Sequence, residues 1–128
     1  LDYRIKKAIR SVADALELPL DESDVVLVGY SQGAQRAEDL AWVFPKRYRR
    51  VALMSGPAPP ETSHVKRTHA LAIARGEREY QRPFRIAAER LAATGRSVRY
   101  FALPGARHGE LGPEGSSVMS ELLAHLVE

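Results

Sequence analysis

The chain of 128 residues contains no cysteine. A disulfide framework and a thiolate metal site are therefore excluded. No apolar run comes close to the roughly 20 residues that cross a bilayer, so the sequence predicts no membrane span. Internal repeats and low-complexity tracts are also lacking, and the length allows one domain with a hydrophobic core.

Aromatic residues are scarce, at 7%, and they do not alternate with basic residues as in nucleic-acid-binding surfaces. The net charge is +3, and the one dense basic run is Lys46–Arg50, between an expected helix and an expected strand. A solvated turn is the simpler interpretation of that run. No lysine stands at P-loop spacing beside the glycine-containing turn. We therefore expect neither a nucleic acid partner nor a phosphate ligand.

The most informative segment is Gly29-Tyr30-Ser31-Gln32-Gly33, which follows the apolar run 25–28 directly. After it, apolar residues recur at helical spacing: Ala34, Ala37, Leu40, Ala41 and Phe44. A G-x-S-x-G sequence between a strand and a helix indicates a nucleophile elbow. We expect the serine to adopt a strained backbone, and we expect a side chain at either flanking glycine to collide with neighbouring backbone.

Four apolar runs alternate with amphipathic segments along the chain. The expected strands are 25–29, 50–55, 69–75 and 98–103, and the expected helices are 1–16, 32–44, 83–94 and 113–127. This alternation indicates an α/β fold with a parallel sheet covered on both faces. Right-handed crossovers bring the carboxyl ends of all strands to one edge, so we expect Ser31, Gly76 and His108 to converge there.

A nucleophilic serine needs an adjacent base, and the base needs an orienting carboxylate. His108 is the best candidate base because it follows the last expected strand, within Pro104-Gly105-Ala106-Arg107-His108-Gly109. The other three histidines, His64, His69 and His125, are expected at the surface.

The chain order serine, acid, histidine, together with the elbow and the Pro-Gly-Ala-Arg-His-Gly segment, resembles the α/β-hydrolase superfamily. Gly-Tyr-Ser-Gln-Gly-Ala looks closest to its carboxylesterase, phospholipase and dienelactone-hydrolase-like branches. The resemblance covers nearly the whole chain but only the second half of the family's fold. It implies that 25–29 is the family's fifth strand and 98–103 its eighth. Residues 1–128 are then a single domain, the C-terminal portion of a hydrolase domain with about four parallel strands.

The family usually places its triad acid after the penultimate strand, commonly three residues past a glycine. Glu79 stands three residues past Gly76 and is the residue that the resemblance implies. Glu77 is the alternative acid, and a third possibility is that neither glutamate orients His108.

The resemblance implies a serine hydrolase that cleaves small carboxylic esters through an acyl-enzyme. Its catalytic residues are Ser31, His108 and Glu79, and the backbone N–H of Gln32 is one donor of the oxyanion hole. No metal or cofactor is implied. The alternative is a non-catalytic remnant of a hydrolase that acts as an interaction domain.

Two features of the family have no counterpart in the sequence. One is the loop after the family's third strand, which supplies the second oxyanion donor. The other is a strand beside residues 25–29, so an apolar sheet edge is expected to be open. Because the chain begins at Leu1, already within a helical pattern, we expect a processed product or a fragment. We expect the open edge to pair with a missing N-terminal half or with a second chain. The connection 56–68 holds three prolines and no large cap, which predicts an open site.

Overall fold

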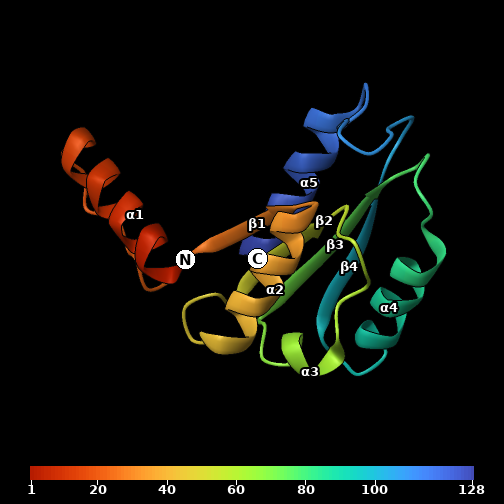
Figure 1. Ribbon diagram of the computed structural model, residues 1–128, viewed down its shortest axis with the longest axis horizontal. Helices are drawn as coiled ribbons and strands as arrows, with labels where there is room; N and C mark the ends of the chain where they lie inside the picture. The colour runs from red at the N-terminus through yellow and green to blue at the C-terminus, as the bar shows by residue number, and fades with distance from the viewer.

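The computed structural model describes all residues, 1–128. Its helices are α1 (Asp2–Leu16), α2 (Gln32–Val43), α3 (Thr62–Val65), α4 (Arg82–Ala92) and α5 (Gly115–Val127). Its strands are β1 (Val26–Tyr30), β2 (Arg50–Met54), β3 (Ala70–Gly76) and β4 (Ser97–Leu103) (Figure 1). Every strand and helix that the hydrophobic pattern predicts is present, with ends that differ by a residue or two.

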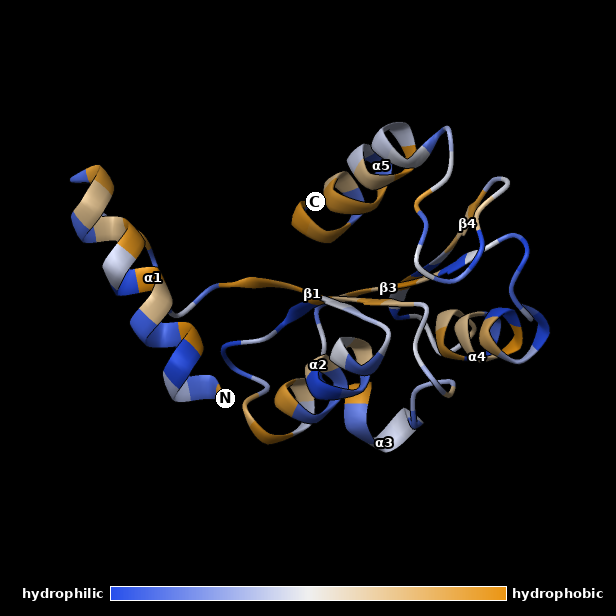
Figure 2. Ribbon diagram, turned by 45° about the horizontal axis from the view of Figure 1, so that its top comes forward, coloured by the Kyte–Doolittle hydropathy of each residue, from blue (hydrophilic) through white to orange (hydrophobic).

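The four strands form one parallel sheet in the order β1-β2-β3-β4. Helix α5 covers one face, and α2, α3 and α4 cover the other (Figure 2). A crossover connects each strand to the next and all pairings are parallel, so all four carboxyl ends lie at the same edge. The predicted α/β class with a covered parallel sheet is confirmed.

A hydrophobic core lies on each side of the sheet. On one side, Val51, Leu53, Leu71 and Ile73 pack against the small residues of α2 and the apolar face of α4. On the other side, alternate residues of the same strands pack against α5, which contributes the fully buried Leu122 and Leu126. Because β2 and β3 are buried on both faces, their sequences are continuous apolar runs.

Helix α1 forms over the predicted residues but buries none of them, and it extends away from the sheet (Figure 1). Its first turn is the anchored part. The carboxylate of Asp2 accepts hydrogen bonds from Tyr48 Oη at 2.7 Å and from Arg47 Nη1 at 2.6 Å. Burial raises the pKa of Asp2, but these two hydrogen bonds and the Arg47 charge outweigh it and hold the pKa below its usual value. Ile5 packs against the core, whereas Val12 and Leu16 stay exposed.

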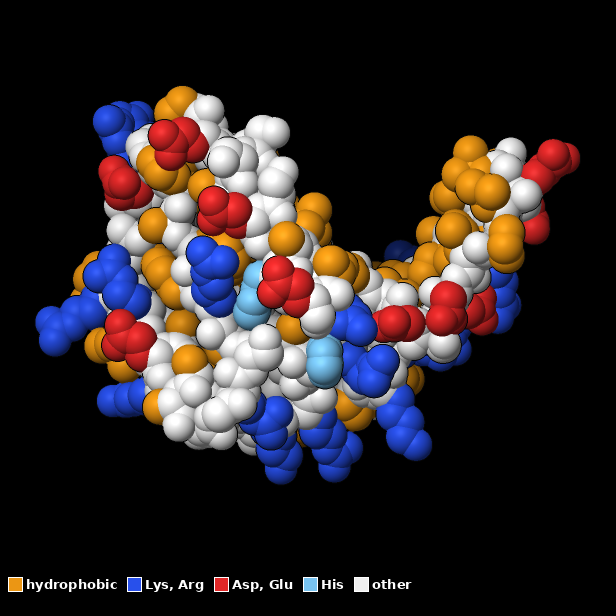
Figure 3. Space-filling model, turned by 180° about the vertical axis from the view of Figure 1, so that it is seen from behind, with side chains coloured by type: hydrophobic (Ala, Val, Ile, Leu, Met, Phe, Trp, Pro, Cys, Tyr) orange, Lys and Arg blue, Asp and Glu red, His pale blue; other side chains and the backbone are white.

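Strand β1 lies at the edge of the sheet, as expected, and pairs only with β2. Val28 on this strand is 41% exposed. Seen from behind, hydrophobic side chains gather on the side of α1 that faces the body and on the surface next to it (Figure 3). An apolar surface therefore extends between the edge strand and the projecting helix.

Two expectations from the sequence are wrong. The sequence predicts a loop over 56–68, but the structure has the short helix α3 within it, whose four residues are too few for a helical pattern to be recognised. The sequence places His64 and His125 at the surface, but both are partly buried. His64 Nδ1 lies 2.7 Å from Glu38 Oε2 and its ring stacks on Trp42, while His125 Nε2 lies 3.0 Å from the carbonyl oxygen of Leu71. His69 is exposed, as expected.

Candidate active site

Ser31 occupies the single residue between β1 and α2, at the carboxyl edge of the sheet. Its φ of 57° and ψ of −121° lie outside the regions that L-residues favour, as the motif predicts. The sharp turn brings the backbone of Gly33 close to Gly29. A Cβ on Gly29 would lie 2.2 Å from the carbonyl oxygen of Gly33, so only glycine fits there.

The expectation for the second glycine is wrong. A Cβ on Gly33 would meet no atom within 4 Å. Gly33 lies in the first turn of α2, and its Cα faces open space rather than neighbouring backbone.

Two hydrogen bonds connect three of the residues singled out by the sequence. Ser31 Oγ lies 3.0 Å from His108 Nε2, and His108 Nδ1 lies 2.7 Å from Glu79 Oε1. An ionised carboxylate only accepts hydrogen bonds, so Nδ1 carries a proton and donates to Glu79. In neutral His108 this leaves Nε2 as an acceptor for the Ser31 hydroxyl. The imidazole is about half exposed, whereas the Glu79 side chain is 7% exposed.

Glu79 sits in a dense set of donors. Its Oε2 accepts hydrogen bonds from Ser55 Oγ at 2.6 Å and from the backbone N–H of Gly76 at 2.8 Å. A guanidinium nitrogen of Arg75 lies 3.6 Å from Oε1. Burial raises the pKa of Glu79, but the hydrogen bonds from Ser55, His108 and Gly76 and the Arg75 charge outweigh it. The pKa therefore lies below its ordinary value, and Glu79 is ionised at neutral pH.

The segments that carry Glu79 and His108 lie against each other after β3 and β4. A Cβ on Gly76 would lie 2.5 Å from the carbonyl oxygen of Ala106, so this approach requires glycine. The same carbonyl accepts a hydrogen bond from the Arg78 N–H at 2.9 Å. Glu77 donates its backbone N–H to Leu103 O, and the residue is exposed. The geometry therefore brings Glu79, and not Glu77, to His108.

Gln32 is the first residue of α2. Its backbone N–H has no acceptor inside the helix, and no hydrogen bond to another part of the backbone uses it. It follows Ser31 directly at the positive end of the helix dipole, where a developing negative charge is favoured.

Three residues near this site were not anticipated from the sequence. Ser55 and Arg75 contact Glu79, and Tyr30 Oη accepts a hydrogen bond from the Gly109 N–H at 2.6 Å. Arg75 also donates to the carbonyl oxygen of Gly56 at 2.6 Å and stacks on the Phe84 ring. Ser55 directly follows β2 and Arg75 is the penultimate residue of β3, and such positions at strand ends are only a weak signal. Ser55 meets Glu79 across 24 positions and Arg75 meets Gly56 across 19, so only the tertiary structure identifies these contacts, whereas Arg75 and Glu79 are four positions apart.

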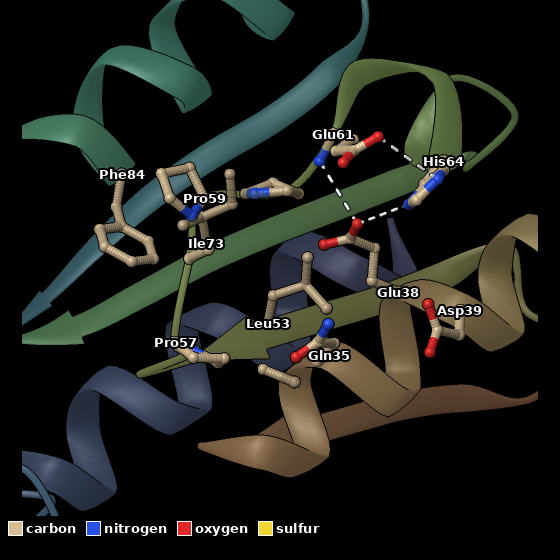
Figure 4. Close-up of a pocket in the computed structure, with 14 residues that line it drawn as sticks. Gln35, Glu38, Asp39, Leu53, Pro57, Pro59, Glu61, His64, Ile73 and Phe84 are labelled. Atoms are coloured by element: carbon tan, nitrogen blue, oxygen red, sulfur yellow. Dashed lines mark hydrogen bonds and ion pairs between the residues drawn. The ribbon is translucent and has the colours of Figure 1, made fainter.

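A pocket of about 120 Å³ lies beneath the proline-containing loop after β2. Leu53, Ile73 and Phe84 form its apolar side, and Glu38, Glu61 and His64 lie at its polar end (Figure 4). Ser31 does not line this pocket. No group of three or more His, Asp or Glu side chains is arranged to hold a metal ion, and no helix is long and apolar enough to cross a membrane.

The fold is similar to solved structures of hydrolases. A thermostable esterase matches over 98% of this chain and 35% of its own, with a TM-score of 0.64 and 22% identity. Esterase PE8 matches over 89% of this chain and 56% of its own, with a TM-score of 0.63 and 20% identity. The S-formylglutathione hydrolase FrmB from Staphylococcus aureus matches over 97% of this chain and 61% of its own, with a TM-score of 0.59 and 11% identity.

No protein-family model and no curated protein match the sequence. The chain spans between 35% and 61% of the length of these three structures. At sequence identities of 22%, 20% and 11%, these matches show a similar fold and nothing more. The chain has a partial α/β-hydrolase fold, as its motifs predict.

Proposed function

We propose that this chain, which has a partial α/β-hydrolase fold, is the C-terminal portion of a serine hydrolase that cleaves carboxylic esters. Ser31 would be the nucleophile, His108 the general base and Glu79 the acid that orients it. The observation that carries the proposal is the pair of hydrogen bonds from Ser31 through His108 to Glu79, at 3.0 Å and 2.7 Å.

In the first half of the reaction, Ser31 Oγ attacks the ester carbonyl carbon while His108 Nε2 takes the hydroxyl proton. The carbonyl oxygen becomes an oxyanion and accepts a hydrogen bond from the Gln32 N–H. Collapse of this intermediate breaks the bond to the alcohol, which leaves with the proton from His108. The acyl group stays on Ser31.

In the second half, a water molecule attacks the acyl-enzyme and His108 takes its proton. Breaking the bond to Ser31 Oγ returns that proton to the serine and releases the carboxylic acid. The ionised Glu79 stabilises the imidazolium that forms in each half and keeps the proton on Nδ1. Its low pKa suits this role, because the carboxylate stays charged at neutral pH.

We also propose that residues 1–128 are the C-terminal portion of an α/β-hydrolase domain and that β1 pairs with a further strand, from a missing N-terminal half or from a second chain. The open edge of β1 and the exposed Val28 support this proposal. The chain also spans only 35% and 56% of the length of the two similar esterase structures, which supports the proposal further. A monodisperse monomer in sedimentation, with slow amide exchange throughout residues 26–30, would argue against pairing.

The activity is tested with a small activated ester such as p-nitrophenyl acetate. We expect hydrolysis by the chain and its loss in Ser31→Ala. Ser120→Ala is the matched control, because Ser120 is exposed on α5 and far along the chain from Ser31. Equal rates for Ser31→Ala and the unchanged chain would contradict the proposal.

A second candidate is a non-catalytic hydrolase remnant that acts as an interaction domain. The apolar surface between β1 and α1 favours it, because unpaired strand edges bind other chains. Binding of another strand without any ester hydrolysis is the result that would support this candidate.

A further inference from the structure

The turn that carries His108 is weakly connected to the rest of the molecule. Residues 107–111 are exposed, Ala106 before them is buried, and the next buried residue is Gly115. Gly105, Gly109 and Gly112 all have positive φ, so this loop follows a path that glycine permits. Burial therefore does little to fix the imidazole.

Three hydrogen bonds join residues 107–110 to other parts of the chain. Two of them are made by the His108 ring, to Ser31 and Glu79. The third is donated by the backbone N–H of Gly109 to Tyr30 Oη, at 2.6 Å. It is thus the one hydrogen bond that holds this turn without using the imidazole.

Tyr30 is well placed to hold the turn. It is the last residue of β1, pairs with Met54 in the sheet and packs against the core on the α5 side. Its ring also lies against the ring of His108, with centroids 5.7 Å apart and planes 34° apart. The residue next to Ser31 in sequence therefore contacts both the backbone and the ring of the His108 turn.

We propose that Tyr30 is a positioning residue for His108 in the reaction proposed above. Its hydroxyl fixes the Gly109 amide, and this restricts the turn to the conformation in which Nε2 reaches Ser31 Oγ. Only the expected effect of Tyr30 on the rate of the reaction rests on the proposed function. The hydrogen bond and its effect on the turn can be tested without any turnover.

The test compares Tyr30→Phe with the unchanged chain, because phenylalanine keeps the ring and removes only the hydroxyl, whose oxygen accepts the hydrogen bond from Gly109. Tyr3→Phe is the matched control, since Tyr3 is 71% exposed on α1. The first readout is hydrogen exchange of the Gly109 amide by NMR. We expect slow exchange in the unchanged chain and in Tyr3→Phe, and exchange at least tenfold faster in Tyr30→Phe. Equally fast exchange in all three would overturn the proposal.

The second readout is the rate at which a fluorophosphonate reacts with Ser31, together with kcat and KM for p-nitrophenyl acetate. We expect Tyr30→Phe to lower the labelling rate and kcat about fivefold to tenfold, with KM and the melting temperature nearly unchanged. A lower melting temperature with an unchanged kcat would mean that Tyr30 only supports the fold, and would overturn the proposal. If the unchanged chain is not labelled at all, the proposed function fails. Hydrogen exchange of the Gly109 amide then decides by itself whether Tyr30 holds the turn.

Gly109→Ala provides an independent check. A Cβ there meets no atom within 4 Å, but the φ of 91° is strained for alanine, so the N–H is expected to turn away from Tyr30. Because both changes would break the same hydrogen bond, Tyr30→Phe should cause no further loss of labelling rate in Gly109→Ala. Additive losses would contradict the proposal.

Discussion

Ser31 and Ser55 leave neighbouring strands in the same way. Both have left-handed φ values, 57° and 48°, and both follow the last residue of their strand. Each donates its backbone N–H across to the next strand at 2.8 Å, Ser31 to Met54 O and Ser55 to Ala74 O. Their hydroxyls then reach opposite ends of one chain of hydrogen bonds, Ser31 to His108 and Ser55 to Glu79.

The acid is tested by Glu79→Gln. Glutamine is similar in shape, but it removes the charge that stabilises the imidazolium and holds the His108 tautomer, so we expect kcat to fall about 10³- to 10⁴-fold. Glu77→Gln is the matched control, because Glu77 is exposed and two residues away. The measurement is steady-state hydrolysis of p-nitrophenyl acetate. A large loss in Glu77→Gln with little loss in Glu79→Gln would reverse the assignment.

The role of Ser55 is tested by a pair of substitutions. Both Ser55→Ala and Ser55→Gly remove the hydrogen bond to ionised Glu79, a loss of about 1.5–3 kcal/mol. Glycine also relieves the backbone strain at φ 48°, so Ser55→Gly should be about 1 kcal/mol more stable than Ser55→Ala. Urea unfolding measures the difference. Equal stabilities of the two variants would show that the backbone of Ser55 is unstrained.

The two glycines of the motif are expected to differ in their tolerance of a side chain. Gly29→Ala places a Cβ 2.2 Å from the Gly33 carbonyl oxygen and should cost about 3 kcal/mol or more, whereas Gly33→Ala meets open space. Alanine is the better helix former by about 1 kcal/mol, so Gly33→Ala should be neutral or stabilising. Thermal unfolding of both variants checks this. Similar destabilisation by both would contradict the turn geometry.

Stability should depend on pH through Glu79. Burial raises its pKa, but hydrogen bonds and the Arg75 charge outweigh burial and lower the pKa on folding. The contribution of the carboxylate is therefore complete above its unfolded pKa of about 4.3 and is lost as pH falls through the lower folded value. Urea unfolding measures the free energy of unfolding of the unchanged chain and of Glu79→Gln at pH 7 and at pH 3. We expect the difference between the two proteins to be smaller at pH 3 than at pH 7. A difference that stays constant would contradict this assignment.

Much of the fold could be predicted because its signals are local. The continuous apolar runs of β2 and β3 and the helical spacing in α2 identify these elements without tertiary information. The resemblance to the α/β-hydrolase superfamily implies Glu79, three residues past Gly76, and this is the carboxylate that contacts His108; the sequence leaves open Glu77 and the possibility that neither glutamate does so. These features depend on residues a few positions apart.

What could not be predicted depends on distant parts of the chain. Ser55 meets Glu79 across 24 positions and Tyr30 meets Gly109 across 79, and neither pair leaves a pattern in the sequence. The apolar face of α1 predicted a helix but not that its second half would remain unburied. Gly33 fitted the motif, yet its lack of neighbours could be known only from the arrangement of β1 and α2.

We infer that His108 and Glu79 activate Ser31. The most direct measurement is mass-spectrometric mapping of the adduct formed by a fluorophosphonate with the folded chain. We predict a single adduct on Ser31, none in Ser31→Ala, and labelling slowed by orders of magnitude in His108→Ala. An unlabelled Ser31 would contradict this, and so would a Ser31 that is labelled as fast in His108→Ala, or in the unfolded chain, as in the folded, unchanged chain.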